Sequence, residues 1–185
     1  MSATAINAGL IPAGSYAVDP AHSNVGFEVR HMGIATVRGS FRKFEGSLDA
    51  TGEAPVLKGA VEVASIDTGD ENRDAHLTSP EFFDVEQHPQ ISFHSTATDA
   101  TDDGKIRLAG EITLKGITKP IQLIGSVNDP GTTDPWGNER VGFEVETVID
   151  RRDFDLKWNQ TLPNGNLLVS NDVKLLVSVS AVKGA

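Results

Sequence analysis

The sequence contains no cysteine, which excludes disulfides, thiolate metal ligands and thiol catalysis. Basic residues are also scarce: 16 Lys and Arg face 26 Asp and Glu, for a net charge of −10. Nucleic acids and anionic membranes attract clustered positive charge, so neither is an expected partner. No segment approaches the roughly 20 apolar residues of a transmembrane helix. We therefore expect a soluble protein without nucleic-acid partners and without stable membrane insertion.

The N-terminus lacks the basic cluster and the apolar run of a secretory leader. We expect residues 1–13 to form a flexible segment and the protein to lie in the cytoplasm. A periplasmic or extracellular location would follow if a leader had been removed. The remaining length suits one domain with a sizeable core, which we place at residues 14–182.

Alternation of apolar and polar residues is the main signal in the chain, and it predicts β-strands. It recurs in about eight segments, near residues 24–31, 37–48, 57–63, 91–95, 106–114, 121–127, 141–149 and 173–179. Within the second segment the phase shifts between Phe41 and Phe44, which predicts a β-bulge. Residues 15–18 are a candidate edge strand or ninth strand, and residues 128–138 a long loop. Short turns between most strands favour antiparallel order, and hence an all-β, extended, eight-stranded antiparallel barrel over a sandwich.

Residues 65–94 form the one long interruption of this pattern. Thr68 and Glu71 have the spacing of a capping box, so a helix is expected to begin near Gly69. Ser79 and Pro80 predict a second, shorter helical turn. We expect one short helical excursion, about residues 68–84, that covers an end of the barrel.

Glycines on the predicted inner faces bear on what the barrel contains. Gly39, Gly59, Gly110 and Gly125 contribute no side-chain volume, which either leaves a cavity or allows the strands to bend. A cavity with these aliphatic and aromatic walls would accept a long hydrocarbon chain.

Polar residues that could carry chemistry are few. No metal-binding spacing of histidines and no nucleophile motif is present, so we expect neither a metal site nor catalytic residues. His31 is either a structural histidine or a polar group at a cavity mouth. Structural ion pairs are expected for Arg73 and Asp74 and for Arg151 and Asp153. The two tryptophans, Trp136 and Trp158, are candidates for an end plug or a dimer contact.

Several ordered motifs resemble the YceI family of bacterial, polyisoprenoid-binding proteins, from about Gly14 to Ala181. They are Tyr16-x-x-Asp19-x-x-His22-Ser23, Phe27-x-Val29-Arg30-His31-Met-Gly33, Val37-Arg-Gly39-x-Phe41-x-x-Phe44-x-Gly46, Ile66-Asp-Thr-Gly69, Asn72-Arg-Asp-x-His-Leu77, Phe82-Phe-Asp84, Pro89-x-Ile91-x-Phe93, Gly110-x-Ile-Thr-Leu-Lys-Gly-x-Thr-Lys-Pro120 and Arg151-x-Asp153-Phe154. The resemblance implies a lipocalin-like barrel with an apolar tunnel, a bound isoprenoid or similar lipid, and a homodimer. Asp155 stands where many relatives have glycine, which puts the local turn geometry in question.

We therefore expect a lipid carrier or store, not an enzyme, with no cofactor beyond a bound lipid. His31 and Arg73 would meet the head group, and Leu77, Phe82 and Phe83 would close or gate the tunnel. The tunnel walls would be Phe27, Phe41, Phe93, Leu108, Ile112, Phe143, Val145 and Val177. The alternatives are an enzyme for a small amphiphile, using His31 or the Arg73, Asp74 and His76 group, and a structural barrel with a filled core.

Overall fold

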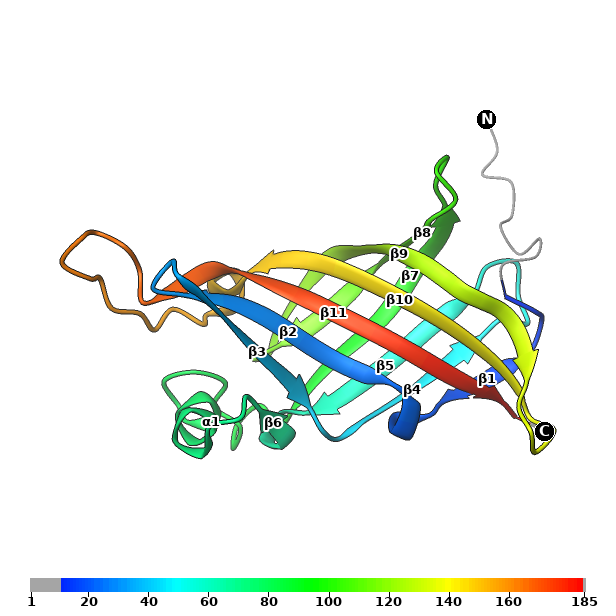
Figure 1. Cartoon of the computed structure of the whole chain (residues 1–185), viewed down its shortest axis with the longest axis horizontal. Coiled ribbons are helices and arrows are strands. Elements are labelled where there is room, and N and C mark those ends of the chain that lie inside the picture. Colours follow the sequence, from blue (N-terminus) through cyan, green and yellow to red (C-terminus); the bar gives the residue numbers. More distant parts are fainter. Residues whose placement is uncertain (1–10, 185) are drawn as a thin grey trace.

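The computed structural model describes residues 11–184, most of which lie in β-strands (Figure 1). Within these residues the single α-helix is α1 (Glu71–Thr78), and three 3₁₀ turns are η1 (Pro20–His22), η2 (Val63–Ser65) and η3 (Arg151–Phe154). The strands are β1 (Ser15–Val18), β2 (Asn24–His31), β3 (Ala35–Phe41), β4 (Phe44–Asp49), β5 (Val56–Glu62), β6 (Ile66–Asp67), β7 (Gln90–Ala100), β8 (Ile106–Leu114), β9 (Ile117–Thr133), β10 (Glu139–Asp150) and β11 (Val169–Lys183).

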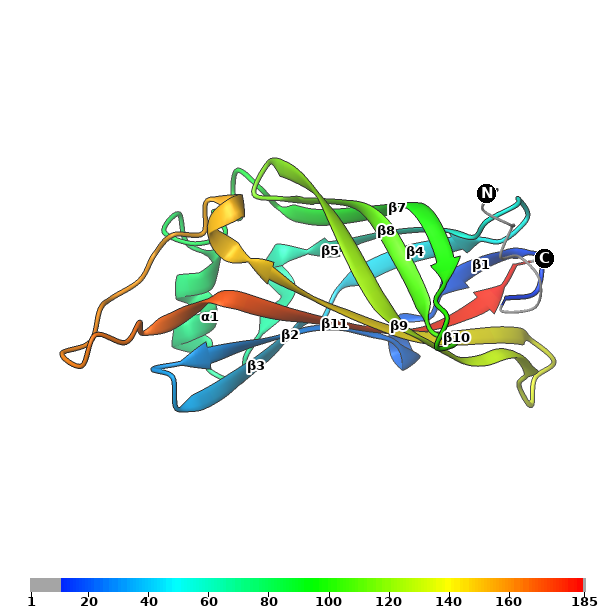
Figure 2. The same cartoon turned by 90° about the horizontal axis from the view of Figure 1, so that it is seen from above.

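Eight of the strands close into an antiparallel barrel, in the order β1, β4, β5, β7, β8, β9, β10, β11 and back to β1. The predicted all-β barrel is therefore confirmed. Residues 15–18 form neither an edge nor a ninth strand, because β1 pairs with both β4 and β11 and completes the ring. The views from the front and from above show an elongated barrel (Figures 1 and 2). We call its two ends the α1 end and the β1 end.

Two bends in the wall shape the α1 end. The chain turns through η1 between β1 and β2, and at Arg42 and Lys43 between β3 and β4. The predicted bulge between Phe41 and Phe44 was wrong, because the strand breaks there and leaves both intervening residues exposed. Beyond these bends β2 pairs with β11 and with β3. The other edge of β3 pairs with the two residues of β6 and not with β5.

The region between β9 and β10 was also predicted wrongly. The long loop expected at residues 128–138 is mostly strand, since Asp129 and Thr133 pair with β10 and only residues 134–138 turn. The Asp134 side chain accepts hydrogen bonds from the backbone of Trp136 and Asn138, which allows this tight turn. Composition alone favoured a loop here, but pairing along a long hairpin overrides that preference.

The β1 end is filled by a cluster of buried side chains. It contains Ile11, Tyr16, Leu48, Ala50, Leu57, Ile106, Leu108, Leu123, Val141, Phe143, Val145, Val179 and Ala181. The segment predicted to be flexible, residues 1–13, lies mostly outside the described residues. Of its described residues, Ile11 is buried in the cluster, Pro12 and Ala13 are exposed, and the Tyr16 hydroxyl donates to the carbonyl of Pro12.

Candidate ligand-binding cavity

A cavity of about 220 Å³ lies inside the barrel towards the α1 end. Its walls are almost entirely apolar and come from every long strand of the barrel, from β2 and β3, and from the segment after α1. The polar residues that border it are Ser23, Glu45, Lys58, Ser92, Arg151 and Ser178. Glu45 and Lys58 are exposed, since their positions alternate with inward-facing neighbours on β4 and β5. Such a site favours an apolar ligand, which gains free energy mainly by leaving water.

Most of the residues expected to line the tunnel do line this cavity. They are Phe27, Phe41, Leu77, Phe82, Phe83, Phe93, Ile112, Val145 and Val177. Leu108 and Phe143 also point inward, but they are buried in the cluster at the β1 end and do not border the cavity. The predicted apolar interior is therefore hollow towards the α1 end and filled by this cluster towards the β1 end.

The cavity differs from the predicted site at two expected residues and at four residues that the sequence did not single out. His31 and Arg73, the expected head-group contacts, do not border the cavity. The wall includes aliphatic positions of β2 and β11 that had not been singled out, namely Val25, Val29, Val173 and Leu175. Their alternation along the strands placed them on the inner face, but it could not show which part of that face is hollow.

The inward glycines play different roles. A Cβ atom at Gly125 would run into the carbonyl oxygen of Glu144, so this glycine allows two strands to approach closely. At Gly39 and Gly110 the space is taken by the rings of Phe27 and Phe93. Gly59 does border the cavity, and a Cβ there would meet only the Glu45 carbonyl, at 3.3 Å. The cavity and the strand-bending explanations thus both hold, at different positions.

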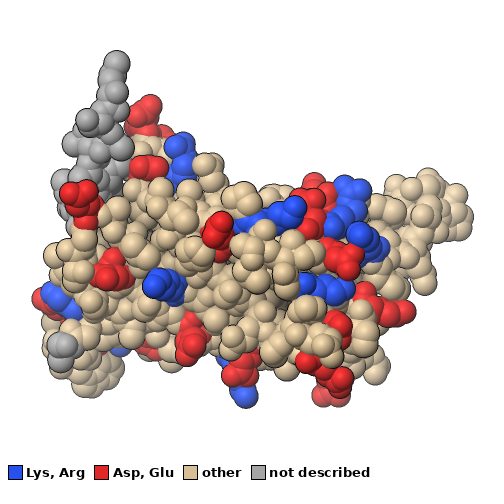
Figure 3. Space-filling view, turned by 180° about the vertical axis from the view of Figure 1, so that it is seen from behind, with Lys and Arg blue, Asp and Glu red and all other residues tan. Residues whose placement is uncertain are grey.

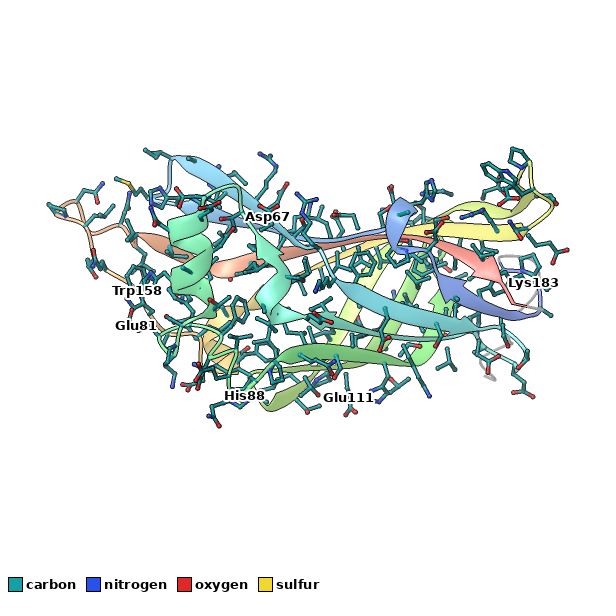
Figure 4. All side chains as sticks on the ribbon, turned by 90° about the horizontal axis from the view of Figure 1, so that it is seen from below. Asp67, Glu81, His88, Glu111, Trp158 and Lys183 are labelled. Carbon is teal, nitrogen blue, oxygen red and sulfur yellow. The ribbon has the colours of Figure 1, made fainter. Side chains whose placement is uncertain are left out.

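Helix α1 and the residues after it cover the α1 end, where β3 pairs with β2 and β6 but not with β5 (Figures 1 and 4). We call residues 66–85 the cover. Its helix begins at Asp70, whose side chain accepts from the N–H of Arg73; the predicted cap at Thr68 was wrong. No residue of α1 itself is buried. The cover instead inserts Leu77, Phe82 and Phe83 into the cavity wall.

Thr68, directly after β6, ties α1 to the end of that strand, although not through the expected ion pair. Its N–H and Oγ1 donate to the Asp74 carboxylate at 3.0 and 2.6 Å. The guanidinium of Arg73 donates to Oγ1 and to the carbonyl of Thr68, at 2.7 and 2.8 Å. Among residues 11–184, Arg73 and Asp74 form no salt bridge, because both side chains are occupied by Thr68.

Aromatic rings join the cover to the loop after η3. The Trp158 ring lies 5.0 Å from the His76 ring and 5.2 Å from the Phe82 ring, measured between centroids. His76 is also hydrogen-bonded to the carboxylate of Glu81. Figure 4 shows Trp158 and Glu81 beside α1. Trp158 therefore takes the expected place at a barrel end, whereas Trp136 is 82% exposed at the opposite end.

Arg151 is the one charged residue that is buried as a whole among the described residues, at 4% exposure. It donates to the carbonyls of Ser170, Leu156 and Trp158, and its pKa is lowered by burial. The predicted ion pair with Asp153 is not found in the described part of the chain. Arg151 instead holds the loop after η3 against β11 through backbone acceptors. Asp155 ends η3 with φ of 58°, a left-handed conformation that favours glycine and that aspartate tolerates.

A polar network on the outer wall fixes the first bend. Arg140 donates to Asp134 and Asp19, both at 2.8 Å, and Asp19 also contacts His22. The hydrogen bond from Arg140 is the main reason that the pKa of Asp19 falls to about 2. The network ties η1 to the β9–β10 hairpin, so it holds one side of the cavity wall in position.

Two other kinds of site are absent from residues 11–184. No group of three or more His, Asp or Glu side chains is arranged to hold a metal ion. No helix in this range has the length and apolar character needed to cross a membrane.

The fold and the cavity define a lipocalin-like barrel with an apolar internal site. The YceI-like domain model matches residues 16–181, and the chain belongs to this family. A UPF0312 protein of Ectopseudomonas mendocina is 34% identical over 97% of this chain and 93% of its own. The Campylobacter jejuni YCEI protein structure has a TM-score of 0.72 at 27% identity, covering 90% of this chain and 96% of its own. A polyisoprenoid binding domain from Saccharophagus degradans has a TM-score of 0.68 at 14% identity, covering 91% and 98%.

Proposed function

We propose that this protein binds one long-chain amphiphilic lipid, a polyisoprenoid by preference, and carries or stores it. The observation that supports this most directly is the cavity inside the barrel, whose walls are almost entirely apolar. Each methylene transferred from water to such a site contributes about 0.8 kcal/mol. The Saccharophagus degradans domain, which has the same fold, is described as polyisoprenoid-binding.

Binding without catalysis is the better supported of the two functional classes. The residues considered for an enzyme, His31 and the group of Arg73, Asp74 and His76, do not border the cavity. Arg73 and Asp74 are engaged with Thr68, and His76 with Glu81. The alternative of a barrel filled throughout conflicts with the cavity, although it describes the β1 end correctly.

A pair of tryptophan substitutions on β11 tests the binding site. Leu175 borders the cavity, whereas Leu176, the next residue on the strand, faces the other side of the sheet. We expect Leu175→Trp to occupy the cavity and weaken binding of a fluorescent isoprenoid at least tenfold, and Leu176→Trp to leave it unchanged. Leu108→Trp is unsuitable because Leu108 lies in the filled cluster.

The readout is fluorescence titration, with circular dichroism to show that both variants fold. Equal binding by the two variants would contradict the assignment of this cavity. Native mass spectrometry of freshly purified protein, followed by organic extraction, identifies any lipid that co-purifies. The predicted homodimer and the predicted cytoplasmic location remain part of the proposal; light scattering and cell fractionation test them.

A further inference from the structure

Two neighbouring segments at the α1 end carry no Asp, Glu, Lys or Arg. They are residues 31–37, at the β2–β3 turn, and residues 158–171, between η3 and β11. Charged residues make up 23% of the chain, so a surface without them is a distinct feature. We call these two segments the uncharged tip. Figure 3 shows a protrusion without Lys, Arg, Asp or Glu beyond the mixed charges of the barrel.

The two segments form one ordered unit. The N–H of Met32 donates to the carbonyl of Leu168 at 2.9 Å, and His31 pairs with Val169. Met32 and Gly33 both have positive φ, 55° and 75°, and build the tight turn that joins β2 to β3. In Figure 1 both segments project from the barrel at the same end as α1.

Backbone polar groups of the longer segment are largely satisfied within it. Leu162 N–H donates to Asn166, Gly165 N–H to Leu162, and Leu168 N–H to Gln160. The Asn159 side chain both donates to and accepts from the backbone of Val169. A segment whose backbone is already hydrogen-bonded loses less free energy when it enters a medium poor in water.

The tip also exposes apolar side chains and adjoins the cavity. Ile34 is 77% exposed and Leu167 is 37% exposed. At the base of the tip, Val29 and Val169 border the cavity. An apolar, uncharged surface thus continues from the outside of the molecule to the walls of the ligand site.

We propose that the uncharged tip docks reversibly on the interface of a phospholipid bilayer and turns the α1 end of the cavity towards the membrane. The partner is a zwitterionic bilayer surface, because a protein of net charge −10 is repelled by anionic lipid. The two segments carry no formal charge of their own, and their neutral amide and hydroxyl side chains suit the headgroup region. The one guanidinium bonded to the β2–β3 turn in the described part of the chain is that of Arg30, which is exposed and donates to the Gly33 carbonyl and to Thr36 Oγ1, so it is placed to remain at the level of the headgroup phosphates. The inference rests on the proposed function, since a lipid carrier must meet the membrane that supplies or receives its ligand.

Flotation with phosphatidylcholine vesicles tests the docking surface. The double variant Ile34→Asp with Leu167→Asp places charge on the tip, and we expect at least tenfold less vesicle-bound protein than for the wild type. The control is Trp136→Asp at the opposite end, where the lost side chain is larger and more exposed, at 82%. It should float like the wild type. Vesicles with anionic lipid should bind the wild type less, and added salt should restore that binding.

Three results would overturn the proposal: a wild-type protein that does not float, a double variant that floats normally, or a Trp136→Asp variant that loses as much. A change in oligomeric state without a change in flotation would assign the tip to contacts between copies and also overturn it. Binding of a fluorescent isoprenoid without vesicles is measured in parallel. The double variant should bind it normally, and failure of the wild type to bind it would count against the proposed function while leaving the flotation result intact.

Discussion

Removing the link between α1 and the end of β6 should loosen the cover and open the cavity without unfolding the barrel. In Asp74→Ala the N–H and the hydroxyl of Thr68 lose their acceptor, at 3.0 and 2.6 Å in the wild type. A hydrogen bond to a charged group contributes about 1.5–3 kcal/mol, and partial exposure of this pair reduces the total to about 2 kcal/mol. A change of that size raises the population of an open cover about 30-fold, at about 1.4 kcal/mol per factor of ten.

The opening should remain local because α1, the helix of the cover, is weakly attached. No residue of α1 is buried, and β6 contributes only two residues of pairing to β3. Hydrogen exchange measured by mass spectrometry should show faster exchange in residues 66–85 and unchanged exchange in β8, β9 and β10. Dissociation of a fluorescent isoprenoid should also become faster, by up to the same factor.

Asn72→Ala is the matched control for this experiment. Asn72 lies in the same helix, is exposed, and gains similar helix propensity on substitution by alanine. The backbone amides of the cover in the Asn72→Ala variant should exchange at the wild-type rate. Unchanged exchange in the cover of Asp74→Ala, or an equal rise across the barrel strands, would refute the view of Asp74 as a local anchor.

Two further predictions concern the barrel wall. Arg140→Gln removes the main interaction that lowers the pKa of Asp19 from 3.8 to about 2. In the wild type, the stability that this interaction adds is fully present above about pH 4 and is lost as the pH falls towards 2. The free energies of unfolding of wild type and variant, measured with urea, should therefore differ by a constant amount near neutral pH and by less over that acidic range. A difference that stays constant at all pH values would show that Arg140 does not set the pKa of Asp19. Gly125→Ala should lower the free energy of unfolding by more than about 3 kcal/mol, because the added Cβ overlaps the carbonyl of Glu144. Gly59→Ala, beside the cavity, should lower it by less than about 1 kcal/mol. Thermal unfolding measures both, and similar losses would show that the wall adjusts at Gly125.

The strand faces could be predicted from the sequence because the two-residue period is a local property. What lies opposite each inward residue is not local. Leu108 and Ile112 share the inner face of β8, yet the first is packed in the filled cluster and the second borders the cavity. The difference arises from Tyr16, Leu48 and Phe143, which come from distant parts of the chain. No pattern within residues 106–114 contains that information.

The cover shows the same limit at shorter range. Thr68 and Asp70 are both good N-caps by residue type, and both precede the helix. Asp70 takes the cap, while Thr68 is held by the side chains of Arg73 and Asp74. The position of the helical excursion could be predicted from the sequence. Which of the two candidate residues caps the helix depends on where β6 pairs with β3.

Because the β1 end is packed solid, a lipid chain has two routes to the cavity, and the Asp74→Ala experiment separates them. One route passes the cover at the α1 end. The other passes through the wall between the two bends, where the β1–β4 pairing ends at Ala17 and Ser47 and the β2–β3 pairing begins at Val25 and Phe41. Residues on both sides of that interval border the cavity, including Ser23 and Phe44. If Asp74→Ala frees the cover but leaves lipid dissociation unchanged, the lipid passes through the wall. Faster dissociation assigns the route to the α1 end, where the uncharged tip also lies.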